Sequence, residues 1–184
     1  MKFLLKFFLG VFTLFILAAL ALSFFLPEKQ EITKIITINA PPKKIYDQLL
    51  SAQYFLNLMN RNDTASMNKA DSTQAVVGTT FRWKEDSFFY KEAQVKLTKA
   101  VPEKEIDFNI VLQGIKNIEG FSKILLNIKG KATQVTWVVS FSTPRPWNIA
   151  NLFYNLEKER GKDFENGLIT LKLFSEVKYE ANLY

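Results

Sequence analysis

The chain has 184 residues, of which 48% are hydrophobic and 23% are charged. This composition is typical of a globular protein, and the length leaves room for one ordinary domain behind an N-terminal apolar segment. Histidine and cysteine are absent, which excludes imidazole bases, thiol nucleophiles, disulfides and metal sites built on those side chains. The net charge is +6, but basic and acidic residues are interspersed, so we expect no nucleic-acid partner.

An uncharged apolar run extends from Phe7 to Leu26. A helix of this length matches the ~30 Å hydrocarbon core of a bilayer. Its Leu, Ile, Phe and Val side chains together favour insertion by roughly 4 to 8 kcal/mol. We therefore predict a transmembrane anchor over residues 1–27, which contacts the membrane through residues 7–26, and one folded domain over residues 28–184.

Charges around the apolar run predict its orientation. Lys2 and Lys6 precede the run and Glu28 follows it, so the positive-inside rule keeps the N-terminus in the cytoplasm. This predicts a single-pass membrane protein whose domain is extracytoplasmic, and periplasmic if the source is a Gram-negative bacterium. A cleaved signal peptide is the alternative, because Ala19-Leu20-Ala21 resembles a small-residue cleavage site. The apolar run continues past that site, which favours the uncleaved anchor.

The first part of the domain mixes strand and helix signals. β-Branched residues over 31–39 predict a first strand. Pro42 can occupy the first turn of a helix, and apolar residues at helical spacing over 45–50 predict that helix, with a second short one over 54–58. The polar stretch over 61–75 predicts a surface loop or a weak edge strand.

Hydrophobic and polar residues then alternate from residue 79 to residue 141, which predicts an antiparallel meander. The turn at Gly130-Lys131 introduces the last strand. The apolar positions of the successive runs are Thr79, Phe81 and Trp83; Ala93, Val95 and Leu97; Ile106, Phe108, Ile110 and Leu112; Ile124, Leu126 and Ile128; and Val135, Trp137, Val139 and Phe141.

The C-terminal part predicts one long amphipathic helix whose apolar face packs on the sheet. Gly161 and Gly167 would leave room beside it. The residues that recur at close to 3.6 spacing are Ile149, Phe153, Leu156, Phe164, Leu168 and Leu171.

A strand, two short helices, antiparallel strands and a long C-terminal helix follow one another in the order of the helix-grip fold. Segments 38–47, 78–83, 101–103, 133–137 and 161–168 also resemble the SRPBCC superfamily, in particular its polyketide cyclase/dehydrase and lipid-transport branch, which is related to START and Bet v 1-like proteins. The resemblance implies an α+β fold in which a curved antiparallel sheet wraps around the long C-terminal helix, here preceded by one transmembrane helix. It also implies a hydrophobic cavity between sheet and helix. The sequence departs from many members at Tyr54-Phe55-Leu56-Asn57-Leu58-Met59, where they carry Trp.

Apolar faces of the predicted elements are candidates for the cavity lining. The same residue types at these spacings form a solid core in most domains, so both interpretations stay open. Arg160 falls between Leu156 and Phe164 on the apolar face of the predicted helix. Its guanidinium could bind a ligand carboxylate or phosphate. Alternatively, it could pair with Glu157 or Asp163. The predicted cavity-lining residues are Phe81, Trp83, Phe108, Ile110, Trp137, Phe153, Arg160, Phe164 and Leu168.

The carboxylates are scattered without a base-and-nucleophile spacing, so no catalytic residue, metal ligand or cofactor is assigned. We expect a membrane-anchored protein that binds a hydrophobic small molecule or lipid without catalysis. One alternative is a cyclase- or dehydratase-like enzyme. The other is a surface-interaction protein with a filled core.

Overall fold

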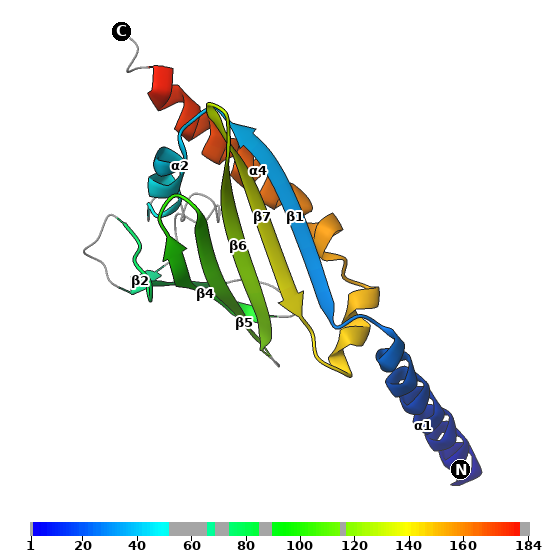
Figure 1. Cartoon of the computed structure of the whole chain (residues 1–184). Helices are drawn as coiled ribbons and strands as arrows, with labels where there is room; N and C mark the ends of the chain where they lie inside the picture. The colour runs from blue at the N-terminus through cyan, green and yellow to red at the C-terminus, as the bar shows by residue number, and fades with distance from the viewer. Residues whose placement is uncertain (1, 52–65, 69–73, 85–89, 115–116, 181–184) are drawn as a thin grey trace.

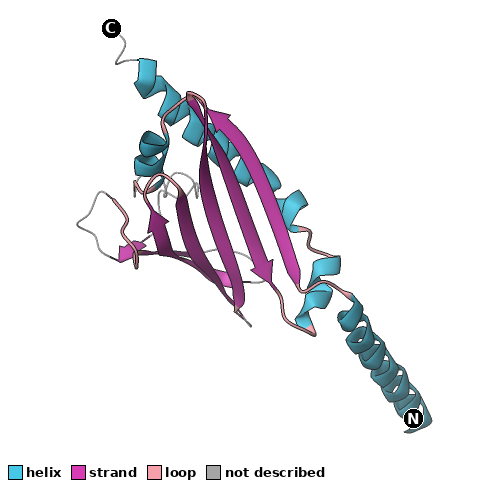
Figure 2. Cartoon of the chain, viewed as in Figure 1, coloured by secondary structure: helices cyan, strands magenta, loops and turns pink. Residues whose placement is uncertain are grey.

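The computed structural model describes residues 2–51, 66–68, 74–84, 90–114 and 117–180. The second short helix predicted over 54–58 lies outside these residues. Figures 1 and 2 show one long helix that projects from an end of a twisted sheet and a second long helix that lies along the sheet. The elements are α1 (Lys2–Phe25), β1 (Lys29–Ile38), α2 (Pro42–Leu49), β2 (Ser66–Asn68), β3 (Thr80–Lys84), β4 (Tyr90–Val101), β5 (Glu105–Gly114), β6 (Ile118–Lys129), β7 (Ala132–Ser142), η1 (Trp147–Leu152) and α4 (Leu156–Glu180).

In the described part of the chain, seven strands form one sheet in the order β1-β7-β6-β5-β4-β3-β2. All neighbouring strands are antiparallel, which confirms the predicted meander and the α+β class. Strand β1 leaves the meander order and pairs with the last strand, in a register that sets Ile32 opposite Val139. Residues 61–75 were predicted to form a surface loop or a weak edge strand, and the described residues Ser66–Asn68 form the edge strand β2.

Alternation along the strands gives the sheet an apolar inner face and a polar outer face. The inner face supplies most of the core, and its fully buried members include Phe81, Leu97, Ile106 and Val135. Helix α2 adds Ile45 and Leu49 to this core, and its N-terminus carries Pro42 in the first turn, as predicted.

Helix α4 lies along β1 and contacts α2, and polar contacts hold it at both ends. At its start, Gln30 Nε2 donates to Tyr154 O (2.9 Å) and Gln30 Oε1 accepts from Leu156 N (2.8 Å). Toward its C-terminus, Glu176 Oε1 accepts from Asn39 N at 2.8 Å. The helix therefore follows the full length of β1.

Lys34 and Glu157 form an ion pair between β1 and α4, with 2.6 Å between Lys34 Nζ and Glu157 Oε1. Gly161 makes room for this pair, because a Cβ at this position would lie 2.7 Å from Glu157 Oε1. The room predicted beside the helix at Gly161 is thus occupied by a neighbouring carboxylate.

The prediction of one continuous helix from Ile149 is wrong at its N-terminal end. Residues Trp147–Leu152 form the 3₁₀ helix η1, and α4 begins only at Leu156. Asn155 caps α4, because its Oδ1 accepts from Lys158 N at 3.0 Å. An asparagine whose side-chain oxygen accepts a hydrogen bond from the backbone N–H three residues later is a typical N-cap. The sequence therefore contained a signal for the start of α4.

Helix α1 is long and apolar enough to cross a membrane. Its side chains are almost all exposed, and the two phenylalanines of its last turn, Phe24 and Phe25, are 67% and 85% exposed. Ser23 is the exception, because the segment around η1 covers it.

Candidate functional site

The inner face of the sheet gathers most of the predicted cavity-lining residues. Strands β3 and β5 place Phe81, Trp83, Phe108 and Ile110 in the same core, at 1% to 9% exposure. The register explains the grouping, because Phe81 lies opposite Val95, which in turn lies opposite Ile110. Residues that are about 30 positions apart in the sequence therefore form one continuous apolar surface.

Trp137 connects this surface to α4. Its ring meets the ring of Phe164 edge to face, with 4.9 Å between centroids. Its indole N–H donates to Ser122 Oγ at 2.8 Å, which satisfies the polar atom of a side chain that is only 6% exposed. Leu168, one turn beyond Phe164, is 3% exposed in the same core. These contacts fix the helix against β7.

Arg160 lies near the N-terminus of α4, and its side chain is half-exposed. Its Nη1 lies 3.4 Å from Asp163 Oδ2, so the pairing with Asp163 considered from the sequence is present. Its Nη2 also donates to the hydroxyl of Tyr90 at 3.3 Å. The guanidinium therefore reaches across from α4 to the start of β4, where it places a positive charge beside the apolar surface.

Phe153 does not join the other predicted lining residues. It follows η1, outside both helices, and its side chain is 87% exposed. The helical periodicity that placed it on the inner stripe does not apply, because the chain is not α-helical before Leu156.

A groove of about 420 Å³ lies on the opposite, outer face of the sheet, near the start of β1. Ile110 is the one predicted cavity-lining residue among the residues that line this groove. Two of its lining residues have small side chains: Ser140, which lies opposite Phe121, and Ser142, which lies opposite Lys29. The groove is lined by Lys29, Asn109, Ile110, Val111, Glu119, Gly120, Phe121, Ser140, Phe141 and Ser142.

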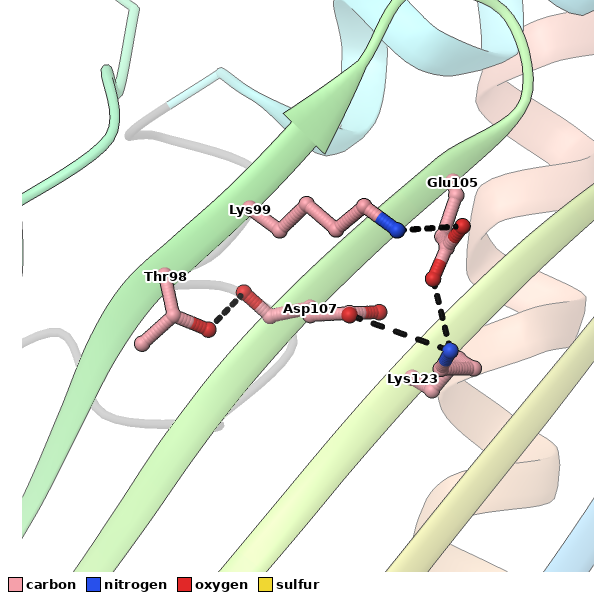
Figure 3. Close-up of polar contacts among 5 residues, drawn as sticks. All are labelled: Thr98, Lys99, Glu105, Asp107 and Lys123. Atoms are coloured by element: carbon pink, nitrogen blue, oxygen red, sulfur yellow. Dashed lines mark hydrogen bonds and ion pairs between the residues drawn. The ribbon is translucent and has the colours of Figure 1, made fainter.

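The outer face also carries a cluster of charged side chains on β4, β5 and β6 (Figure 3). Glu105 accepts from Lys99 at 2.9 Å and from Lys123 at 2.6 Å. These hydrogen bonds, first that of Lys123 and then that of Lys99, lower the pKa of Glu105 to about 2. Asp107 is 3.8 Å from Lys123 Nζ, and its other carboxylate oxygen is buried without a hydrogen-bond partner.

Burial raises the pKa of Asp107 above its ordinary value, and the adjacent negative charge of Glu105 raises it further. The ionised form is thus less stable in the folded protein than in the unfolded chain. The penalty is absent below the ordinary aspartate range, where both states are protonated, and it develops as the pH rises through the raised pKa.

We therefore expect Asp107→Asn to raise the melting temperature at pH 7, because the variant removes the carboxylate that burial and Glu105 disfavour. Lys123 keeps its shorter ion pair with Glu105 in this variant. Thermal melts monitored by circular dichroism from pH 3 to pH 8 would test this. The gain should shrink toward pH 3.

Glu105→Gln is the matched control, with the opposite sign. It should destabilise the protein at pH 7 and converge with the wild type as the pH falls toward about 2, because the stabilisation from Glu105 is lost as this carboxylate is protonated. A melting temperature that falls in Asp107→Asn at pH 7 would contradict the buried-carboxylate interpretation.

Several residues that shape these sites were not identified from the sequence. Tyr90 contacts Arg160, and Ser122 contacts Trp137. Both pairs are far apart in the sequence, and no local sequence pattern predicts them. Asn148 is fully buried beside the end of α1. Within the described ranges, no group of three or more acidic side chains is placed to hold a metal ion.

No protein-family model matches the chain, and no curated protein has a significantly similar sequence. Solved structures do resemble it. Mll3558 from Rhizobium loti is 14% identical, with a TM-score of 0.58 over 79% of this chain and 96% of that chain. The Aha1 dimer from Colwellia psychrerythraea is 19% identical, with a TM-score of 0.55 over 80% and 97%.

Norcoclaurine synthase from Thalictrum flavum, solved in complex with dopamine and hydroxybenzaldehyde, is 12% identical, with a TM-score of 0.60 over 80% of this chain and 88% of that chain. The fold is Bet v 1-like. This agrees with the predicted helix-grip class: a curved antiparallel sheet and a long C-terminal helix, with an N-terminal apolar helix in front. Identities this low show the fold alone, since one fold carries many functions.

Proposed function

We propose that the protein is a membrane-anchored, non-catalytic binding protein for a hydrophobic or amphipathic small molecule or lipid. The observation that carries the proposal is the inner face of the sheet, where aromatic and aliphatic side chains from β3, β5 and β7 form one apolar surface opposite α4. Ligand sites are commonly lined by such side chains, with a few polar groups that set orientation. The Bet v 1-like fold supports this, because it suggests ligand binding.

Arg160 would bind the polar end of an amphipathic ligand. Its guanidinium lies beside the apolar surface and already meets the Tyr90 hydroxyl. Arginine presents paired N–H groups that match carboxylate and phosphate oxygens. Asp163, at 3.4 Å on an exposed surface, is a weak competitor, since exposed ion pairs contribute little.

The anchor in this proposal is α1, with its N-terminus in the cytoplasm and the domain on the extracytoplasmic side. Lys2 and Lys6 flank the apolar run on the side that would be retained. The membrane is then both the attachment site and the nearest source of apolar ligand.

A cyclase-like enzyme is the second candidate, favoured by the likeness to norcoclaurine synthase. Catalysis would require polar groups free to move protons. Two polar side chains on the inner face are instead engaged in structural contacts: Ser122 with the Trp137 indole and Thr133 with the Ala40 carbonyl oxygen. This favours binding without chemistry.

Native mass spectrometry of the full-length protein, released from detergent after production in a lipid-containing host, tests the proposal. Lipids held by α1 would also remain bound, so two matched variants are compared. Ile110→Trp adds an indole at a 9% exposed inner position, and Ile35→Trp makes the same change at a 59% exposed outer one. We expect the wild type and Ile35→Trp to retain one additional lipid or apolar metabolite that Ile110→Trp lacks.

Identical adducts in all three proteins would show that the bound lipid belongs to α1 and would contradict the carrier function. A wild-type domain that carries no bound ligand, and whose melting temperature does not change with any lipid of a test panel, would favour the alternative of a surface-interaction protein with a filled core. Circular dichroism spectra of the variants serve as the folding control, because overpacking a core position typically costs 1–3 kcal/mol.

A further inference from the structure

Three large apolar side chains are exposed on the segment that follows β7. Trp147 and Leu152 belong to η1 and are 54% and 51% exposed, and Phe153, directly after it, is 87% exposed. Leaving such side chains in water is unfavourable. A short run of residues with this much exposed apolar area indicates a surface that is covered in the working protein.

Hydrogen bonds attach this segment to the end of α1. Asn148 Nδ2 donates to Ser23 O at 2.7 Å and to Leu26 O at 3.0 Å, and Asn151 Nδ2 donates to Pro27 O at 3.0 Å. Carbonyl groups at the end of a helix have no partner within the helix. The side chains of η1 supply these partners, and Figure 1 shows η1 beside the C-terminal end of α1.

Arg145 strengthens the same junction. It forms an ion pair with Glu28 at 3.0 Å and lies over the ring of Phe24, 5.4 Å from the ring centroid. The position of η1 relative to the last turn of α1 is therefore set by several independent contacts rather than by one.

The position of α1 in a bilayer then gives the depth of η1. The uncharged run ends at Leu26, and Ser23 lies only about 5 Å before it along the helix. With α1 spanning the bilayer, Asn148, which donates to both carbonyls, would lie at the boundary between acyl chains and headgroups, with Trp147 next to it. Tryptophan and other aromatic residues are enriched at this boundary, and the exposed Phe24 and Phe25 of α1 occupy the same level.

We infer that η1 and Phe153 form a second membrane contact, in which Trp147, Leu152 and Phe153 insert into the interfacial region of the bilayer beside α1. The inference rests on the proposed membrane-spanning role of α1. The contact holds the domain against the lipid surface by the end of the sheet where β1 begins.

Quenching of tryptophan fluorescence by brominated lipids tests the contact in full-length protein reconstituted into phosphatidylcholine vesicles. Trp83 and Trp137 are 8% and 6% exposed within the domain, so the difference between the wild type and Trp147→Phe isolates Trp147. We expect strong quenching of Trp147 by bromines near the headgroup end of the chains. Leu14→Trp in the Trp147→Phe background serves as the depth control and should be quenched most by bromines near the chain ends.

Quenching of Leu14→Trp without quenching of Trp147 would overturn the contact and leave the anchor intact. Absence of quenching at both positions would overturn the membrane span and, with it, the contact. Phe153→Trp in the Trp147→Phe background gives a second reading: an emission maximum typical of water, insensitive to bromine, would also overturn the inference. Vesicle flotation confirms that each variant is reconstituted.

Discussion

Truncating Trp137 to alanine will lower the free energy of unfolding by about 3–5 kcal/mol, the usual cost of removing a buried tryptophan side chain. The indole is 6% exposed and packs edge to face on Phe164. Its loss also leaves the Ser122 hydroxyl without its donor in the core. Urea titration of the full-length protein in detergent, followed by far-ultraviolet circular dichroism, measures the change.

Trp147→Ala provides the matched control, since it removes the same side chain from a position that is 54% exposed. It should change the unfolding free energy by no more than ~0.5 kcal/mol in detergent. Trp137→Phe should fall between the two, because it keeps the contact with Phe164 but loses the hydrogen bond to Ser122. Equal losses for Trp137→Ala and Trp147→Ala would show that the β7–α4 contact is not part of the stable core.

Replacing Asn148 with aspartate will release η1 from α1 while the sheet stays folded. The change is nearly isosteric, but it removes both amide N–H donors and sets a carboxylate against the carbonyl oxygens of Ser23 and Leu26. Ser23 O keeps a long hydrogen bond from Arg145 Nε at 3.4 Å, but Leu26 O loses the amide donor of Asn148. A buried acceptor left without a donor costs about 1–3 kcal/mol, so local opening should increase roughly 5- to 150-fold. Hydrogen exchange across residues 143–155 should accelerate by this factor.

Asn151→Asp is the comparison, because Asn151 makes one hydrogen bond of this kind, to Pro27, at an exposed site. Its effect on exchange should be several-fold smaller. Exchange in β6 and β7 should stay unchanged in both variants, since their ladder does not depend on η1. Accelerated exchange throughout the sheet after Asn148→Asp would instead mean that the junction supports the whole domain.

The strands could be predicted because one face of the sheet is buried. Alternation from Phe81 to Phe141 follows directly from the pleat, and the inner positions proved to be the core. Ile128 departs from this pattern. It lies at the end of β6, next to the turn at Gly130, and is 69% exposed.

The C-terminal region shows where periodicity fails. Ile149 and Phe153 continue the helical spacing of α4, yet the chain there forms η1 and its tail. The competing interaction is tertiary: Asn148 bonds to carbonyls at the end of α1, about 125 residues away. Sequence spacing contains no information on such a partner, whereas the local cap at Asn155 could have been recognised.

The candidate site was predictable in its apolar part and not in its polar part. Phe108 and Trp137 follow from alternation, but the contact between Arg160 and Tyr90 joins residues 70 positions apart. Buried Asp107 was also unexpected, because it occupies an outward position of β5 where exposure is the rule. Asp107 lies opposite Lys99, beside a register shift in β4, and Lys123 Nζ lies 3.8 Å from its carboxylate.

Only Leu26, Pro27 and Glu28 separate α1 from β1, and each has a backbone carbonyl that accepts a hydrogen bond from the segment after β7. In the proposed membrane-anchored protein, a connection this short gives the domain no freedom to swing away from the bilayer. The distance that the domain can extend from the membrane is then set by the length of its elements. This length is about 33 Å along the ten residues of β1 and about 38 Å along the 25 residues of α4. A molecule bound here would move between lipid and domain at one fixed site, and transfer to a second membrane would require that membrane to come within about 40 Å. For the proposed lipid-binding function, this geometry favours handover between closely apposed membranes or to a soluble acceptor that binds the domain.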